Sequence, residues 1–179
     1  MNKKIFTFII IIIVIMFLYA GCKKEVVDSR KYYDVHKVSE SEYEVVLYGS
    51  DNDIVEKLSY PKQPYIKLHE NQIIEVSIST GNPSRYAILF EPISEKISKI
   101  YFNYLLYEYG KVIYMKDGKL IISDAFDKSV YYKEVSRNYS STANSSSVVS
   151  NVKFLDDNKL LFKYLEGNKY ETKEEIIDL

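Results

Sequence analysis

The chain is poor in the residues that build metal centres, since it has one cysteine and two histidines in 179 residues. The single cysteine, Cys22, cannot form a disulfide within the chain or a metal site of several thiolates. The two histidines, His36 and His69, could share a metal or a general-base site only if the fold brought them together. We expect both at the surface or at a sheet edge, and we predict neither a metal nor a cofactor.

An excess of basic charge is also lacking, with 24 basic and 25 acidic residues. Loss of Lys3 and Lys4 with a targeting segment would leave 24 − 2 = 22 basic against 25 acidic residues, a net charge of −3. No stripe of Lys and Arg alternates with aromatic residues, which excludes the electrostatic footprint of a nucleic-acid-binding protein. Such a domain would need a covalent anchor to stay on an anionic membrane.

The first 21 residues are arranged like an export signal, with positive charge first, then an apolar run, then small residues. Two lysines precede an apolar run from Ile5 to Leu18, and the small residues Ala20 and Gly21 precede Cys22. The segment Tyr19-Ala20-Gly21-Cys22 resembles the lipobox of bacterial lipoproteins, although an aliphatic residue is usual where Tyr19 stands. The sequence therefore predicts a signal peptide over 1–21.

The lipoprotein resemblance implies transfer of a diacylglyceryl group to the Cys22 thiol and cleavage between Gly21 and Cys22. Two acyl chains would hold the mature protein stably on the extracytoplasmic face of the cell membrane. The alternative is an uncleaved anchor, since Ile5 to Gly21 is at the lower limit of a membrane-spanning helix. Residues 22–31 are expected to be a lipidated tether, and 32–179 a single β domain.

Short runs rich in Val, Ile and Tyr, separated by turn residues, predict about eleven or twelve strands in the mature chain. They fall in loose groups around 32–59, 65–102, 111–135 and 149–177. Lys116-Asp117-Gly118-Lys119 is the clearest hairpin turn. The segment 103–110 is ambiguous between a strand and a helical turn, and 136–147, rich in Ser and Asn, is expected to be a mobile loop.

This pattern predicts an all-β fold, an antiparallel meander that forms a sandwich, a barrel or a propeller-like stack of sheets. From Tyr65 onward the chain resembles uncharacterised exported proteins of low-GC Gram-positive bacteria, a resemblance that implies no activity. The segments that carry it are Pro64-Tyr65-Ile66, 74–81 (IEVSISTG), 124–128 (DAFDK), 131–134 (YYKE) and 164–170 (YLEGNKY).

Motifs of catalysis are absent. There is no Gly-x-Ser-x-Gly elbow, no phosphate-binding glycine loop and no HExxH helix. Asp51, Asp53 and Glu56 could offer oxygen ligands to Ca²⁺, but the segment lacks the glycine and the distal glutamate of an EF-hand loop. We expect a solvated hairpin turn there.

Tyrosine is abundant, with 18 residues against no tryptophan. An exposed tyrosine patch could bind a glycan, a peptide or a protein, but half-buried strands also favour tyrosine. With no catalytic motif, the sequence favours a non-enzymatic binding module that presents a face to an envelope protein or polymer. The alternatives are an envelope hydrolase whose site is assembled only in three dimensions, and a subunit or assembly helper of a larger exported complex.

Overall fold

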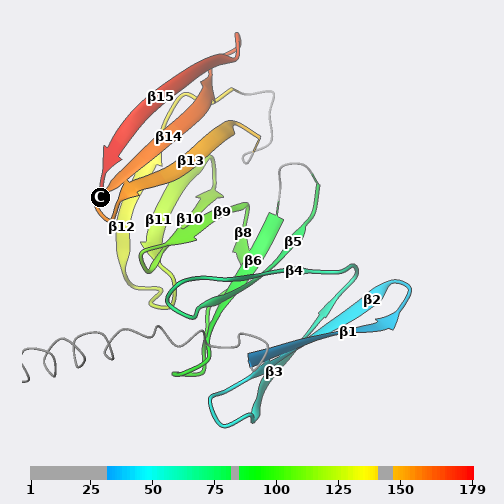
Figure 1. Cartoon of the computed structure of the whole chain (residues 1–179). Coiled ribbons are helices and arrows are strands. Elements are labelled where there is room, and N and C mark those ends of the chain that lie inside the picture. Colours follow the sequence, from blue (N-terminus) through cyan, green and yellow to red (C-terminus); the bar gives the residue numbers. More distant parts are fainter. Residues whose placement is uncertain (1–31, 82–84, 141–146) are drawn as a thin grey trace, which may run out of the picture.

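The described residues of the computed structural model, 32–81, 85–140 and 147–179, form an all-β protein of four antiparallel sheets (Figure 1). The predicted signal peptide, the tether and Cys22 lie outside the described residues. Each sheet is built from consecutive strands of the chain, as the grouping in the sequence predicts.

The first sheet has the order β1-β2-β3 and the second β4-β5-β6-β7, with β8 also paired to β6. The third has the order β12-β11-β10-β9 and the fourth β13-β14-β15. The bounds are β1 Tyr33–Ser39, β2 Glu42–Tyr48, β3 Ile54–Tyr60, β4 Tyr65–Leu68, β5 Ile74–Ser79, β6 Arg85–Glu91, β7 Lys96–Ile97, β8 Tyr101–Phe102, β9 Tyr104–Glu108, β10 Lys111–Lys116, β11 Lys119–Asp124, β12 Tyr131–Ser136, β13 Val149–Asp156, β14 Lys159–Glu166 and β15 Glu171–Asp178.

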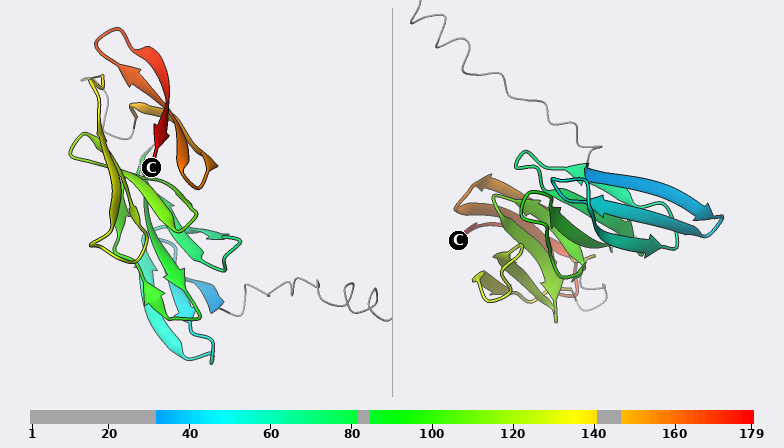
Figure 2. Two further views of the ribbon diagram at one scale, coloured as in Figure 1. Left: turned by 90° about the vertical axis from the view of Figure 1, so that its left-hand side faces the viewer. Right: turned by 90° about the horizontal axis from the view of Figure 1, so that it is seen from below.

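The four sheets are stacked in chain order, from β1–β3 at one end of the molecule to β13–β15 at the other (Figures 1 and 2). A separate apolar core fills each of the three spaces between neighbouring sheets. Val45, Val76 and Phe90 belong to the core between the first and second sheets, and Leu89 and Tyr104 to the next. The third core, between the third and fourth sheets, is centred on side chains such as Ile113, Met115, Leu160 and Phe162.

The place of a sheet in the stack explains the hydropathy of its strands. The central strands β5 and β10 are covered on both faces, so Ile74 to Ile78 and Val112 to Met115 are buried without interruption. Strands of the end sheets cover a core with one face only, and β14 alternates between buried and half-buried positions. Two-sided burial gives a continuous apolar run, whereas one-sided burial gives alternation.

The Asp117-Gly118 turn confirms the predicted hairpin between β10 and β11. Both residues have positive φ, 50° and 72°, as a two-residue type I′ turn requires. Lys116 pairs directly with Lys119 across the turn. The segment between Tyr60 and Tyr65, with its two prolines, separates the first sheet from the second, as expected of residues that cannot donate to a ladder.

Two local predictions need correction, and each adds one strand; the described residues contain fifteen strands in all. The expected strand over 96–102 is broken into β7 and β8 at Ser98. Its N–H still donates to Leu89 O at 2.9 Å, but its side-chain Oγ accepts the hydrogen bond from Leu89 N at 2.9 Å. The ambiguous segment 103–110 contains strand β9 and no helical turn. Tyr104 and Tyr107 there are buried against the second sheet, and this packing favours the extended backbone.

The stack does not close into a barrel among the described residues. Within the same residues, no helix has the length and apolar character needed to cross a membrane. The expected loop over 136–147 contains the end of β12 and an isolated bridge of Tyr139 to Glu166. Its middle, 141–146, lies outside the described residues.

Candidate functional site

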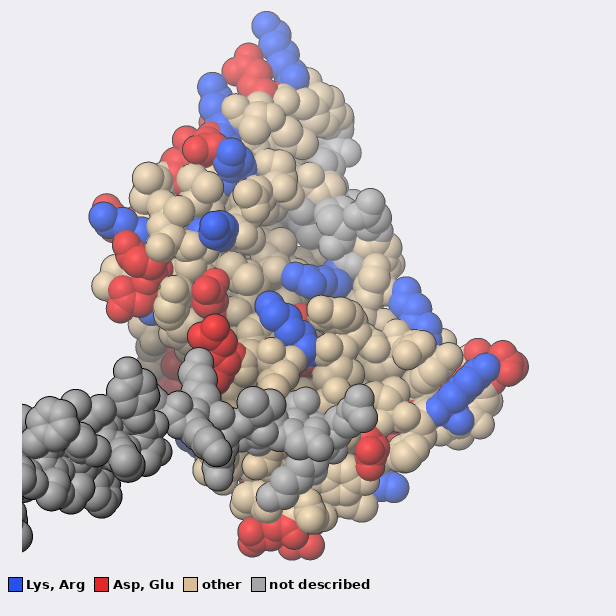
Figure 3. All heavy atoms as spheres, in the orientation of Figure 1, with Lys and Arg blue, Asp and Glu red and all other residues tan. Residues whose placement is uncertain are grey.

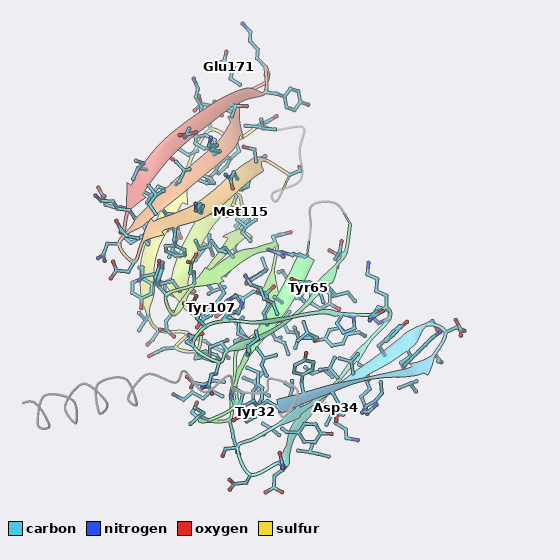
Figure 4. All side chains as sticks on the ribbon, viewed as in Figure 1. Tyr32, Asp34, Tyr65, Tyr107, Met115 and Glu171 are labelled. Atoms are coloured by element: carbon cyan, nitrogen blue, oxygen red, sulfur yellow. The ribbon has the colours of Figure 1, made fainter. Side chains whose placement is uncertain are left out.

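A groove runs between β4, the outer strand of the second sheet, and β9, the outer strand of the third. Two adjoining hollows of about 360 Å³ and about 520 Å³ make up the groove, and Lys67 and Leu106 line both of them. Tyr65 lines one hollow and Tyr107 the other, and both residues are labelled in Figure 4. This groove is the strongest candidate site because charged groups from several strands converge on it.

A buried carboxylate lies at the base of the groove. Glu75, in the middle of β5, is 2% exposed. Its Oε2 lies 3.0 Å from His69 Nε2 and accepts a hydrogen bond of 2.7 Å from the Tyr104 hydroxyl. The network thus joins the second sheet to the third across their shared core, and no buried side-chain nitrogen or oxygen of the described residues lacks a hydrogen-bond partner.

The surroundings of Glu75 keep it ionised. Burial raises the pKa of its carboxyl, but the hydrogen bonds from His69 and Tyr104 and the charge of Arg85 outweigh burial, so the pKa lies below its ordinary value. Because an ionised carboxylate only accepts hydrogen bonds, His69 Nε2 carries a proton. Burial, followed by the nearby Glu75 charge, raises the pKa of Tyr104, so its hydroxyl remains a donor.

Arg85 covers one wall of the groove and occupies the open edge of β9. Its Nε donates to Tyr104 O at 3.3 Å and its Nη2 to Leu105 O at 2.5 Å. The guanidinium lies 4.8 Å from the centre of the Tyr104 ring, a cation–π contact. Carbonyl groups that an outer strand would leave unpaired are therefore satisfied by a side chain from β6.

The other end of the groove is held by the turn between β4 and β5. Asn71 Nδ2 donates to the Tyr107 hydroxyl at 2.7 Å, and the rings of His69 and Tyr107 make an edge contact with centroids 4.8 Å apart. Gln72 has a positive φ of 66°, and its N–H bonds to His69 O at 2.9 Å. This tight turn fixes His69 beside Glu75.

Charge is divided along the groove. Lys67 and Arg85 line one hollow, and Glu70 and Glu108 line the far part of the other. Figure 3 shows basic side chains at the centre of this face, where β4 lies in Figure 1, with acidic side chains to their left. Within the part of the chain that the structure describes, Lys67 has no ion-pair partner, since Glu75 is engaged by His69.

The structure separates the two histidines that the sequence singles out. His36 is exposed on β1, opposite Glu44. His69 directly follows the edge strand β4, as an edge position requires, but its side chain is not at the surface: it is 9% exposed and paired with Glu75. Sequence reasoning missed Glu75, although a signal existed. A glutamate inside the buried run Ile74 to Ile78 needs a buried partner.

Asp51 and Asp53 lie in the turn that joins β2 to β3, as expected, whereas Glu56 lies in β3. In the turn, Gly49 N bonds to Asp53 O at 2.9 Å and Asn52 has a positive φ of 64°. Across the described ranges, no group of three or more His, Cys, Asp or Glu side chains is placed to hold a metal ion.

The tyrosines divide between the cores and the surface. Tyr101, Tyr104 and Tyr107 are buried with their hydroxyls hydrogen-bonded, as Tyr101 shows with a bond of 2.6 Å to Ala125 O. The exposed tyrosines that line the groove, Tyr65 and Tyr109, lie in different hollows of it. Tyr65 is 61% exposed beside the groove and Tyr109 is 53% exposed at its far end.

A histidine beside a carboxylate, as in the His69–Glu75 pair, is also the arrangement of the base and orienting residues in a catalytic triad. A triad also needs a nucleophile, and among the described residues no Ser or Thr hydroxyl hydrogen-bonds to His69. His69 Nε2 already makes a hydrogen bond with the Glu75 carboxylate. The arrangement is therefore better suited to holding the groove in shape than to activating a nucleophile.

Comparisons with protein-family models, with curated proteins and with solved structures find no match for this chain.

Proposed function

We propose that this chain is a membrane-anchored binding module on the extracytoplasmic face of the cell, which holds a ligand in the groove between β4 and β9. The observation that carries the binding proposal is the groove itself, with the uncompensated Lys67 at its centre. Ligand sites are usually concave and largely pre-formed, with a few polar or charged groups that fix the orientation of the ligand.

The anchoring half of the proposal rests on the N-terminal sequence. The apolar run followed by Ala20-Gly21-Cys22 is the support for export and for lipid on Cys22. No other cysteine competes for modification. A membrane-held groove would act on partners in the envelope, a protein or a polymer, and not on nucleic acid.

Cys22→Ser is expected to abolish incorporation of a labelled fatty acid and to leave the precursor uncleaved or the domain released. The reason is that the thiol is the atom that would accept the diacylglyceryl group. Metabolic labelling with an alkyne fatty acid measures this directly, with wild type as the positive control. Continued labelling of the variant would contradict lipidation at Cys22.

Ligand binding in the groove is tested by a photo-crosslinking amino acid placed at Tyr65 in the full-length anchored protein. The matched control places the same residue at Ile176, which is 59% exposed on the fourth sheet, against 61% for Tyr65. We expect a discrete crosslinked product from position 65 that position 176 does not give. Equal products from both positions would contradict a groove-centred function.

A hydrolase is the second candidate function, favoured only by the His69–Glu75 pair beside the groove. It would require a water or a substrate hydroxyl at the remaining ring nitrogen of His69. Binding without chemistry requires only the shape and charge of the groove, and we therefore place it first.

A further inference from the structure

We propose that the groove binds an extended peptide that adds to the open edge of β4 and places one acidic side chain between Lys67 and Arg85. This inference rests on the proposed function and names the class of its partner. The hydrogen-bond pattern of β4, the capped start of β9 and the charges of the groove support it.

The backbone of β4 offers a row of unused groups. His69 N bonds to Ile73 O at 2.9 Å, so the pairs formed with β5 by His69, Lys67 and Tyr65 are the hydrogen-bonded ones. The N–H and C=O groups of Ile66 and Leu68 then point away from β5. Within the described residues no strand pairs with that side of β4, which is the template for strand addition.

At the start of the facing strand β9, Arg85 already bonds the carbonyl oxygens of Tyr104 and Leu105. This part of the β9 edge is therefore capped, whereas the edge of β4 is open. A peptide on β4 would project every second side chain over the groove, since side chains alternate along a strand.

The charges select an acidic residue for that position. Lys67 lies at the junction of the two hollows without an ion-pair partner in the described chain, and Arg85 lines the same hollow. Glu75 offsets part of this charge, since its ionised carboxylate interacts with Arg85, so Lys67 and Arg85 against Glu75 leave this hollow with one positive charge in excess. Glu70 and Glu108 at the far end would repel a run of acids, so one acidic side chain fits and a polyacidic tail does not.

The probe is a fluorescent seven-residue peptide of alternating Thr and Val with Asp at its centre, titrated by anisotropy into the full-length protein in detergent micelles. We expect binding to weaken roughly fivefold to tenfold when Lys replaces the central Asp. The same peptide with backbone N-methyl groups on alternate residues is expected to lose at least about fivefold, because it cannot complete the ladder.

Lys67→Glu is expected to reverse the preference, so that the Lys peptide binds better than the Asp peptide. Lys153→Glu, a surface change on the fourth sheet, is the charge-matched control and is expected to leave the preference unchanged. In both variants, circular dichroism verifies the fold. Amide exchange at Ile66 and Leu68 should slow when the Asp peptide is bound.

Equal affinity of the methylated and unmethylated peptides would overturn strand addition, and an unchanged preference in Lys67→Glu would overturn the acidic contact. Absence of binding by every peptide would overturn the inference as a whole. Each of these results is distinguishable from failure of the proposed function, because a crosslink specific to position 65 would still establish a ligand in the groove.

Discussion

Replacing Glu75 with alanine is expected to lower the free energy of unfolding by about 3 kcal/mol, because it leaves two buried hydrogen-bonding groups without their partner. His69 and the Tyr104 hydroxyl both lose the same acceptor atom. Urea denaturation followed by circular dichroism measures the change. A loss no larger than that of a surface carboxylate would contradict the assigned role.

The matched surface variant is Glu174→Ala, which removes the ion pair between Glu174 and Lys163. The Glu174 side chain is 51% exposed. Solvent screens this pair, so its loss is expected to cost less than about 1 kcal/mol. The comparison isolates burial, since each variant removes one carboxylate from a contact with one side-chain nitrogen.

The effect of Glu75 should also depend on pH in a defined direction. Its pKa is lower in the folded protein than in the unfolded chain, so the carboxylate stabilises the fold above its ordinary pKa of about 4.3. That contribution is lost as pH falls through the lower, folded-state pKa. The stability difference between wild type and Glu75→Gln should therefore shrink on acidification, and a difference that grew would contradict the pKa direction.

Replacing Phe162 with alanine is expected to cost about 4 kcal/mol, the range for a large aromatic side chain deleted from a close-packed core. Phe162 is fully buried between the third and fourth sheets and stacks on Tyr164 with ring centroids 5.0 Å apart. Leu155→Ala, on a side chain that is 48% exposed, is the control and should cost less than about 1 kcal/mol.

The layered architecture gives the Phe162 variant a spatial signature. Because each core lies between two neighbouring sheets, the cavity should increase amide exchange in β10 and β14 more than in β2, which borders a different core. Exchange that rose uniformly over all four sheets would mean that the stack unfolds as one cooperative unit and would contradict the local effect.

The sequence by itself determined the class of fold and the position of most strands. Period-two runs such as those of β14, apolar runs such as those of β5 and β10, and the Asp117-Gly118 turn are local signals. They depend on a few neighbouring residues, and the grouping into four sheets follows from the short turns between them. Sequence also supplied the candidate lipidation residue, Cys22, which no described residue tests.

Only the tertiary structure decided where the candidate site lies. Lys67, Glu75, Arg85 and Tyr104 come from four strands of two sheets, and their meeting depends on how those sheets stack. Likewise, the segment of β9 is extended because Tyr104 and Tyr107 pack into the core between the second and third sheets. Local propensity determines which segments form strands. Burial and charge pairing between the sheets depend on contacts between residues far apart in sequence, and the pattern of neighbouring residues carries no information about these contacts.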